Sequence, residues 1–141
     1  MKILVAVDGS SNSLRAVKFA VNLVKDLRSK SSITLINVHD DDPLGMVKRY
    51  VGSQVVKDYL IEMSQKELKS ALKILDKSQV KHSCIIELGH VPTMICNIAK
   101  AEKSDMIIMG AKGRSSVSDI VLGSVSQRVS VLAKQAVLLV K

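Results

Sequence analysis

Short, mostly apolar runs alternate along the chain with longer segments in which apolar residues recur every three or four positions. The first kind is typical of strands buried in a parallel sheet, and the second of amphipathic helices. The short runs are Ile3 to Val7, Ser32 to Val38, Val80 to Leu88, Met106 to Met109 and Ala136 to Val140. We therefore predict five strands alternating with four helices. Successive right-handed βαβ units of this kind form a three-layer α/β sandwich around a parallel sheet.

The helical segments carry their own boundary signals. Ser10 or Ser11 can cap the first helix, and Pro92 suits the first turn of the third, where its missing N–H costs nothing. The fourth is expected from Ser124 to Ala133. The second is expected from about Gly52 to Lys77, with an apolar side formed by Val56, Leu60, Met63, Leu68, Leu72 and Leu75. The least regular stretch, Asp40 to Val51, is expected to be a mobile loop.

Length and composition narrow the class of protein. A chain of 141 residues with 47% hydrophobic and 24% charged residues is typical of one soluble globular domain, here residues 1–141. No apolar run approaches the roughly 20 residues of a membrane span. Asp8 follows the first apolar run too early for a signal peptide, so we expect a cytoplasmic protein without a membrane partner. Cys84 and Cys96 lack metal-ligand spacing and are expected to be buried thiols.

The formal net charge of +8 suggests an anionic partner, such as nucleic acid or a phosphorylated small molecule. The basic residues, however, recur at helical spacing, as Lys66, Lys69, Lys73 and Lys77 in one segment and as Arg15, Lys18 and Lys25 in another. Such stripes are usually solvated helix faces. With two tyrosines, one phenylalanine and no tryptophan, the chain also offers few aromatic rings on which unpaired bases could stack. We therefore do not expect nucleic acid to be the partner.

Candidate chemistry lies where the first and fourth strands end. In an open α/β sheet, ligands bind beyond the carboxyl ends of the strands, at the point where the strand order reverses. The first strand is followed by Asp8, Gly9 and Ser10, which place a carboxylate in a tight turn. Taken alone, Asp8 could equally be an ordinary turn or helix-capping residue.

The segment after the fourth strand combines glycines, hydroxyls and positive charge. Its residues of interest are Gly110, Lys112, Gly113, Arg114, Gly123, Ser124 and Ser126. Glycines let backbone N–H groups approach an anion, and the start of the last helix adds partial positive charge, which suits a di- or triphosphate. A side chain at Gly113 or Gly123 would then displace the ligand or strain the backbone.

The glycine motif has an ordinary alternative, because two glycines spaced in this way after a strand most often form a simple turn. The P-loop pattern and the dinucleotide-binding glycine pattern are both absent from the chain. What strengthens the interpretation is the full order, Gly110-x2-Gly113-x9-Gly123-Ser124. A single turn does not need this sequence of glycines.

At these residues the chain resembles the universal stress protein family. The resemblance covers the length, the order of elements, the Val7-Asp8-Gly9-Ser10 turn and the complete glycine motif, which is characteristic of the family's ATP-binding branch. It implies an adenine nucleotide alpha hydrolase-like fold, with a five-stranded parallel sheet in the order 3-2-1-4-5 and four helices. Gly9 is a departure, because many relatives carry a larger residue there. This glycine would leave the turn less constrained.

The resemblance also implies a nucleotide site. Ala6, Val7 and Asp8 would line the adenosine pocket, and Val38 would meet the adenine through its backbone. Met109 and Gly110 would border the ribose. The phosphates would be held by Gly113, Arg114, Gly123, Ser124, Val125 and Ser126.

The function that the resemblance implies is that of an ATP-binding, nucleotide-dependent regulator or switch in the stress response. The ligand would be ATP, ADP or AMP, and Mg2+ could accompany the phosphates. No residues are assigned to catalysis or to a metal site, so we expect at most slow ATP hydrolysis, with Asp8 as a conceivable helper. The alternative is a dimeric scaffold that binds a protein partner and no nucleotide.

The last strand, Ala136 to Val140, should lie at an edge of the sheet in the implied strand order. A long apolar edge strand is an aggregation hazard unless it is covered or paired, and only Lys134 and Lys141 flank this one with charge. We therefore predict a homodimer in which this strand pairs antiparallel with its copy about a two-fold axis.

Overall fold

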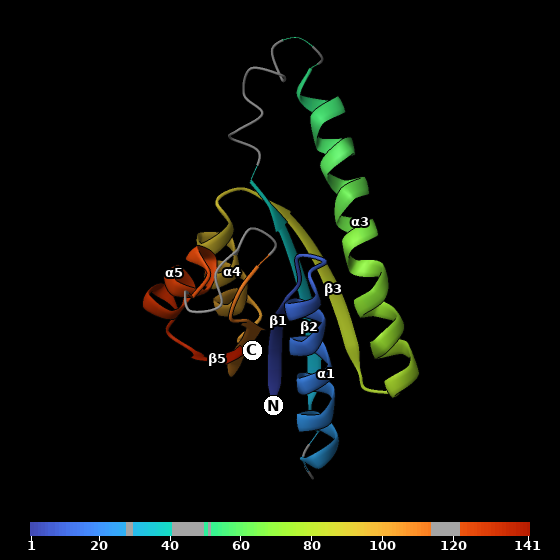
Figure 1. Cartoon of the computed structure of the whole chain (residues 1–141), viewed down its shortest axis with the longest axis vertical. Coiled ribbons are helices and arrows are strands. Elements are labelled where there is room, and N and C mark those ends of the chain that lie inside the picture. The colour runs from blue at the N-terminus through green and yellow to red at the C-terminus, as the bar shows by residue number, and fades with distance from the viewer. Residues whose placement is uncertain (28–29, 41–49, 51, 114–121) are drawn as a thin grey trace.

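Five parallel strands form one sheet, in the order β3-β2-β1-β4-β5, in the computed structural model, which describes residues 1–27, 30–40, 50, 52–113 and 122–141. The elements are β1 (Lys2–Ala6), α1 (Ser11–Asp26), β2 (Ser32–His39), α3 (Ser53–Ser78), β3 (His82–Leu88), α4 (Val91–Ala101), β4 (Met106–Gly110), α5 (Ser124–Leu132) and β5 (Ala136–Val140). This arrangement confirms the predicted fold class and strand order (Figure 1).

Two apolar layers hold the helices against the sheet. On one face, Val5 of β1 packs with Val17 of α1 and Leu68 of α3. On the other face, Leu4 of β1 packs with Ile95 of α4 and with side chains of α5. Successive side chains of a strand point to opposite faces, so a central strand that serves both layers must be apolar throughout. Figure 1 shows α1 and α3 on one side of the sheet and α4 and α5 on the other.

The centre of the sheet is where the chain changes direction. β1 lies between β2 and β4, and its Ala6 pairs with Ile36 on one side and Met109 on the other. From β1 the chain moves to β2 by way of α1, whereas from β4 it moves the opposite way to β5 by way of α5. The carboxyl ends of β1 and β4 therefore form a topological switch point.

The start of β3 and the buried side of α3 differ from the sequence prediction, and most other boundaries shift by one residue. β3 begins at His82 rather than Val80, because the Val80 N–H donates to Ser78 Oγ at 3.2 Å and Gln79 is left-handed, with φ 61°. In α3, Ser64 and Ala71 are buried, whereas Met63 and Leu72, predicted as part of the apolar side, are only partly buried. The other buried residues of α3 are, as predicted, Val56, Leu60, Leu68 and Leu75. The expected mobile loop from Asp40 to Val51 falls almost wholly outside the described residues.

Gly9 is more constrained than the sequence suggested. Its φ is +79°, in the left-handed region that side chains disfavour. A Cβ at this position would also lie 3.1 Å from Cγ of Glu67 on α3. The expectation of a less constrained turn was therefore wrong, because a backbone conformation and a neighbouring helix both require glycine here.

Both cysteines are free thiols, as expected, but only Cys96 is partly buried. Cys84 is exposed on β3, an edge strand, whereas Cys96 of α4 is partly buried. Loss of solvent contact raises the pKa of both thiols, which keeps them in the less reactive protonated form. The expectation that both are buried was wrong for Cys84.

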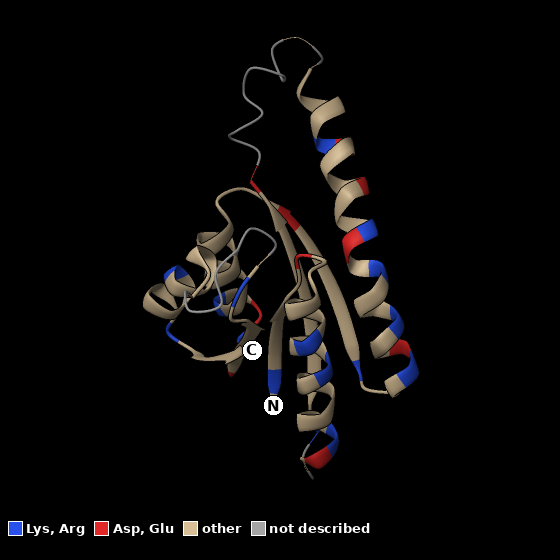
Figure 2. Ribbon diagram, viewed as in Figure 1, with Lys and Arg blue, Asp and Glu red and all other residues tan. Residues whose placement is uncertain are grey.

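The basic stripes lie on the outer faces of α1 and α3 (Figure 2). On α3, Lys66 Nζ and Glu62 Oε1 are 2.8 Å apart, and the hydrogen bond from Lys66 lowers the pKa of the Glu62 carboxyl. Both side chains are largely exposed, so the pair contributes little to stability. Within the described ranges, no helix is both long enough and apolar enough to span a membrane.

Candidate functional site

The turn after β1 and the loop after β4 meet at the switch point. A Cβ placed on Gly113 would lie 3.0 Å from Asp8 Oδ2. A Cβ on Gly110 would lie 2.9 Å from Cβ and 3.0 Å from the carbonyl carbon of Asn12 at the start of α1. The glycines therefore allow the two segments to approach more closely than side chains would permit.

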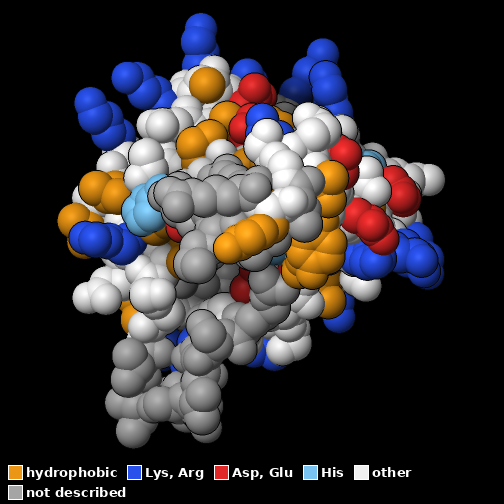
Figure 3. Space-filling model, turned by 90° about the horizontal axis from the view of Figure 1, so that it is seen from above, with side chains coloured by type: hydrophobic (Ala, Val, Ile, Leu, Met, Phe, Trp, Pro, Cys, Tyr) orange, Lys and Arg blue, Asp and Glu red, His pale blue; other side chains and the backbone are white. Residues whose placement is uncertain are grey.

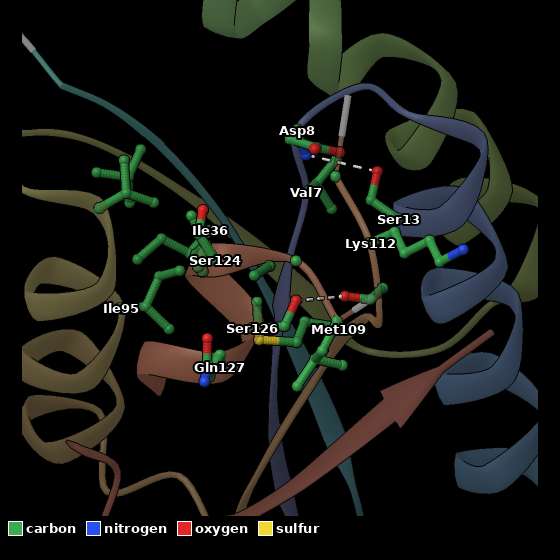
Figure 4. Close-up of a pocket in the computed structure, with 18 residues that line it drawn as sticks. Val7, Asp8, Ser13, Ile36, Ile95, Met109, Lys112, Ser124, Ser126 and Gln127 are labelled. Atoms are coloured by element: carbon green, nitrogen blue, oxygen red, sulfur yellow. Dashed lines mark hydrogen bonds between the residues drawn. The ribbon is translucent and has the colours of Figure 1, made fainter. Parts of the chain in front are cut away.

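The β1 turn is organised by its own polar groups. Asp8 Oδ1 accepts a hydrogen bond from the Ser10 N–H at 3.0 Å, and Ser10 Oγ caps α1 by accepting from the Ser13 N–H at 3.1 Å. The Asp8 N–H faces Ser13 Oγ at 3.4 Å (Figure 4). Asp8 is therefore a turn residue, which is one of the roles that its sequence position allowed. Its second carboxylate oxygen, Oδ2, faces Gly113 in the loop after β4.

The loop after β4 is tied to the sheet on both sides of residues 114–121. The Ala111 N–H donates to the Val140 carbonyl at 2.7 Å, and the Gly123 N–H donates to the Ala111 carbonyl at 2.9 Å. The buried Ser126 hydroxyl donates to the Gly110 carbonyl at 2.9 Å, as the second dashed line in Figure 4 shows. The start of α5 is therefore fixed directly beside the end of β4.

The two helix N-termini at this point differ. α1 is capped by Ser10, but among the described residues no side chain caps α5, whose N-cap position is Gly123. The first N–H groups of a helix have no partner within it and carry partial positive charge. At α5 these groups belong to Ser124, Val125 and Ser126, all of which line a cavity. The start of α5 is therefore suited to an anion.

A cavity of about 560 Å³ opens at the switch point, within the range of small-molecule sites, roughly 300–1,000 Å³. It is lined by Ala6, Val7, Asp8, Ser13, Ile36, Val38, Val91, Ile95, Met109, Gly110, Lys112, Gly113, Leu122, Gly123, Ser124, Val125, Ser126 and Gln127. Figure 3, which looks onto the carboxyl ends of the strands, shows hydrophobic side chains near the middle of this face and Lys and Arg at its rim.

The lining of the cavity is part apolar and part polar. Ile36 and Ile95 approach it from β2 and α4, Ser124 from the start of α5, and Asp8 from the turn after β1 (Figure 4). The Lys112 side chain extends toward α1, away from Ile95. An apolar slot beside backbone donors suits a ligand with a flat ring at one end and negative charge at the other.

The structure brings the predicted site residues together. All of them except Arg114 line this one cavity, and Arg114 lies outside the described residues. Sequence reasoning did not assign Val91, Ile95, Ile36 or Gln127 to the site, because helical and strand periodicity gave the apolar ones an ordinary core role. Their place in the cavity depends on α4 and α5 lying side by side on the same face of the sheet.

Gly113 and Gly123 do not serve to adopt a backbone conformation that other residues disfavour. The positive-φ glycines of the described chain are Gly9, Gly52 and Gly89, and Gly123 has a φ of −62°. The alternative that Gly113 or Gly123 avoids a strained conformation was therefore wrong. Glycine at Gly123 instead allows two backbone segments to pack closely, since a Cβ there would lie 3.3 Å from Lys112 Cα.

The backbone of Val38 points toward the switch point. In a parallel sheet, successive residues of a strand bond alternately to the two neighbouring strands. The Gly89 N–H donates to the His39 carbonyl, which therefore faces β3, and the Val7 N–H donates to the Ile36 carbonyl, which faces β1. Val38 must then direct its N–H and C=O toward β1, whose pairing has ended at Ala6.

The site offers few metal ligands. Asp8 is the one carboxylate in the lining of the cavity that the structure describes. Over the described ranges, no three His, Cys, Asp or Glu side chains come together as a metal site would require. Backbone N–H groups and hydroxyls therefore dominate the polar side.

The fold and the cavity define an open parallel α/β protein with a cavity at its switch point. A sequence profile of the universal stress protein family matches residues 1–141. Universal stress protein MJ0531 of Methanocaldococcus jannaschii is 33% identical, over 99% of this chain and 81% of its own. Universal stress protein YxiE of Bacillus subtilis is 31% identical, over 99% of this chain and 98% of its own. The chain belongs to the universal stress protein family.

Solved structures agree with this assignment. The structure of the hypothetical protein MJ0577 of Methanocaldococcus jannaschii, reported as a structure-based assignment of biochemical function, has a TM-score of 0.85 and 28% identity, over 99% of this chain and 94% of its own. The universal stress protein from Archaeoglobus fulgidus in complex with dAMP shares the fold, with a TM-score of 0.69 and 24% identity, over 100% of this chain and 98% of its own.

Proposed function

We propose that this protein is a cytoplasmic, ATP-binding member of the family that acts as a nucleotide-dependent regulator or switch in the stress response. The observation that carries the proposal is the cavity at the switch point, where the glycine motif and the uncapped start of α5 face an apolar slot. The dAMP complex of the Archaeoglobus fulgidus protein supports an adenine nucleotide as the ligand. ADP and AMP fit the same chemistry.

In this proposal the adenine lies in the apolar slot between Ile36, Val38 and Ile95. The Val38 N–H and C=O supply one donor and one acceptor toward the base, which matches the polar edge of adenine. Met109 and Gly110 border the ribose. The phosphates lie against the backbone of Gly113 and Gly123 and the first turn of α5, and Arg114 adds positive charge.

Binding, rather than catalysis, is the proposed role. Asp8 already accepts a hydrogen bond from the Ser10 N–H, and it is the one carboxylate in the described lining. No histidine is among the described lining residues. Mg2+ would neutralise phosphate charge, and any ATP hydrolysis would be slow without a base that orients water.

The proposal is tested by the small molecules that the purified protein carries. Heat release followed by mass spectrometry should detect AMP, ADP or ATP, and calorimetric titration of the stripped protein should give saturable binding of ATP. A well-folded sample that releases no nucleotide and shows no titration heat would contradict the proposal. The dimeric scaffold would then be the better function.

Ser124→Ala should weaken ATP binding less than Gly113→Val does. One hydrogen bond to a charged group contributes about 1.5–3 kcal/mol, and tenfold in affinity corresponds to about 1.4 kcal/mol. The backbone N–H groups of the α5 first turn remain, so most phosphate contacts survive. Calorimetric titration measures the change, and abolished binding in this folded variant would mean that the hydroxyl, not the backbone, carries the site.

We also propose a homodimer that pairs the free edges of two β5 strands. β5 is an edge strand, and Val140 directs its carbonyl to the Ala111 N–H in the loop after β4. By alternation, Val137 and Leu139 turn their backbone N–H and C=O groups outward. Val131, in the last turn of α5, is an apolar side chain that is 77% exposed. An exposed apolar side chain of this kind also favours the alternative function, a dimeric scaffold that binds a protein partner.

Val137→Lys should convert the dimer into a monomer or cause aggregation, because it places a charge on the paired strand, at a side chain that packs against the α4 and α5 layer. Light scattering with size-exclusion chromatography measures the change in mass. Ala136→Lys, at the exposed start of the strand, is the matched control and should remain dimeric. A parent protein that is a stable monomer at micromolar concentration would contradict the dimer.

A further inference from the structure

A buried amide stands out on the strand behind the cavity. Asn37 of β2 is 1% exposed, between Ile36 and Val38, which both line the cavity. Its Nδ2 donates to the Val7 carbonyl at 2.8 Å and to Glu67 Oε2 at 2.8 Å. Its Oδ1 has no hydrogen-bond partner among the described residues. A buried acceptor without a partner costs stability, so an apolar residue would serve the core better here.

The Glu67 side chain connects this amide to the β1 turn. Glu67 belongs to α3, on the face of the sheet opposite α4 and α5, and its Oε2 lies 3.1 Å from His39 Nε2. The side chains of Glu67 and His39 are each only 11% exposed. The same Glu67 side chain packs beneath Gly9, where a Cβ would lie 3.1 Å from its Cγ. One carboxylate-bearing side chain therefore contacts both Asn37 and the turn.

Asn37 also replaces a backbone interaction of the sheet. The Val7 N–H donates to the Ile36 carbonyl, and in a continuing parallel ladder the Val7 carbonyl would next accept from the Val38 N–H. The Asn37 amide binds this carbonyl instead. It thereby holds the end of β1 at a position where the Val38 N–H remains directed toward the switch point.

We propose that Asn37, oriented by Glu67, is a positioning residue that holds Val7 and the β1 turn so that the Val38 backbone faces the base of a bound adenine nucleotide. This inference rests on the proposed function and assigns a role in the site to α3, which contributes none of the described lining residues. Displacement of Val7 would move Asp8, whose Oδ2 faces Gly113. The effect should be largest at the base, because Val7 and Val38 lie at that end.

Asn37→Leu tests the positioning role, since it removes the amide donor and also the unpartnered acceptor. We expect at least about tenfold weaker binding of adenosine, AMP and ATP alike. Resistance to urea should also fall, because the Val7 carbonyl and Glu67 Oε2 lose this donor. Glu67→Gln keeps an oxygen that can accept from Asn37 and should stay within about twofold of the parent. Lys66→Ala, next to Glu67 but exposed, is the matched control and should bind as the parent does.

A purely structural role predicts a loss of stability alone. If Asn37→Leu lowers resistance to urea while the affinity for adenosine and ATP is unchanged, the positioning role is wrong. Equal losses in Glu67→Gln and Asn37→Leu would also contradict it, because the conservative variant retains the acceptor. Asn37→Ser allows the same measurements if Asn37→Leu does not fold.

Amide hydrogen exchange separates this inference from the proposed function, because it needs no nucleotide. In the ligand-free protein, Asn37→Leu should speed exchange of the Asp8 and Ser10 amides by about tenfold or more, which reports opening of the β1 turn. Lys66→Ala should leave that exchange unchanged. If the parent binds no adenine nucleotide but exchange responds as expected, the proposed function fails and the positioning of the turn stands. Unchanged exchange at both amides would overturn the positioning role.

Discussion

Gly113→Val should weaken ATP binding by at least about tenfold while the protein stays folded. The glycine lies at the cavity, and any side chain there would project beside Asp8 Oδ2, 3.0 Å from the Cβ position. Backbone N–H groups at this point could then no longer approach phosphate. Loss of one charge-assisted contact costs about 1.5–3 kcal/mol, and a steric block removes more than one. Calorimetric titration measures the affinity, and circular dichroism confirms folding.

Two variants make the Gly113 result specific. Gly123→Val should likewise lose ATP binding, because Gly123 faces the same cavity from the start of α5. Lys66→Ala, on the exposed basic stripe of α3, should leave ATP affinity unchanged. Folded Gly113→Val and Gly123→Val proteins with the parent's affinity would show that the nucleotide site lies elsewhere.

Gly110→Ala should lower the free energy of unfolding by about 1–3 kcal/mol, the usual cost of overpacking. The new Cβ would lie 2.9 Å from Asn12 Cβ, and 3.0 Å from both the Asn12 carbonyl carbon and the Lys112 carbonyl oxygen. Two of these neighbours are backbone atoms, which cannot rotate away. Urea unfolding measures the loss.

Gly113→Ala is the control for this stability effect. Its nearest neighbour is a carboxylate oxygen of a side chain that can change rotamer, so the free energy of unfolding should change much less than in Gly110→Ala. Gly110 and Gly113 thus have different tasks within one motif: the first allows α1 to pack against β4, and the second keeps the cavity open. Equal stability of the two variants would contradict this division.

The strands, the helices and the fold class could be predicted from the sequence because their signals are local, whereas the strand order was implied by the family resemblance. Apolar runs such as Ile3 to Val7 are short and continuous, as burial on both faces requires, and Ser10 and Pro92 mark helix starts by their own hydrogen-bonding properties. The glycine spacing and the turn at Asp8 were also visible as sequence. Together with the family resemblance, they identified residues that line one cavity.

How distant segments complete the site depends on the packing of the helices against the sheet. Ile95 reads as an ordinary core residue of α4, and its place in the cavity follows from the packing of α4 beside α5 over the end of β1. Gly9 looked permissive in the sequence, yet Glu67 of α3, 58 positions later in the chain, packs against it. The buried contacts of Asn37 with Val7 and Glu67 have no periodic signal. Periodicity reports which face of an element is apolar, but a contact between elements depends on their packed geometry, which no local pattern encodes.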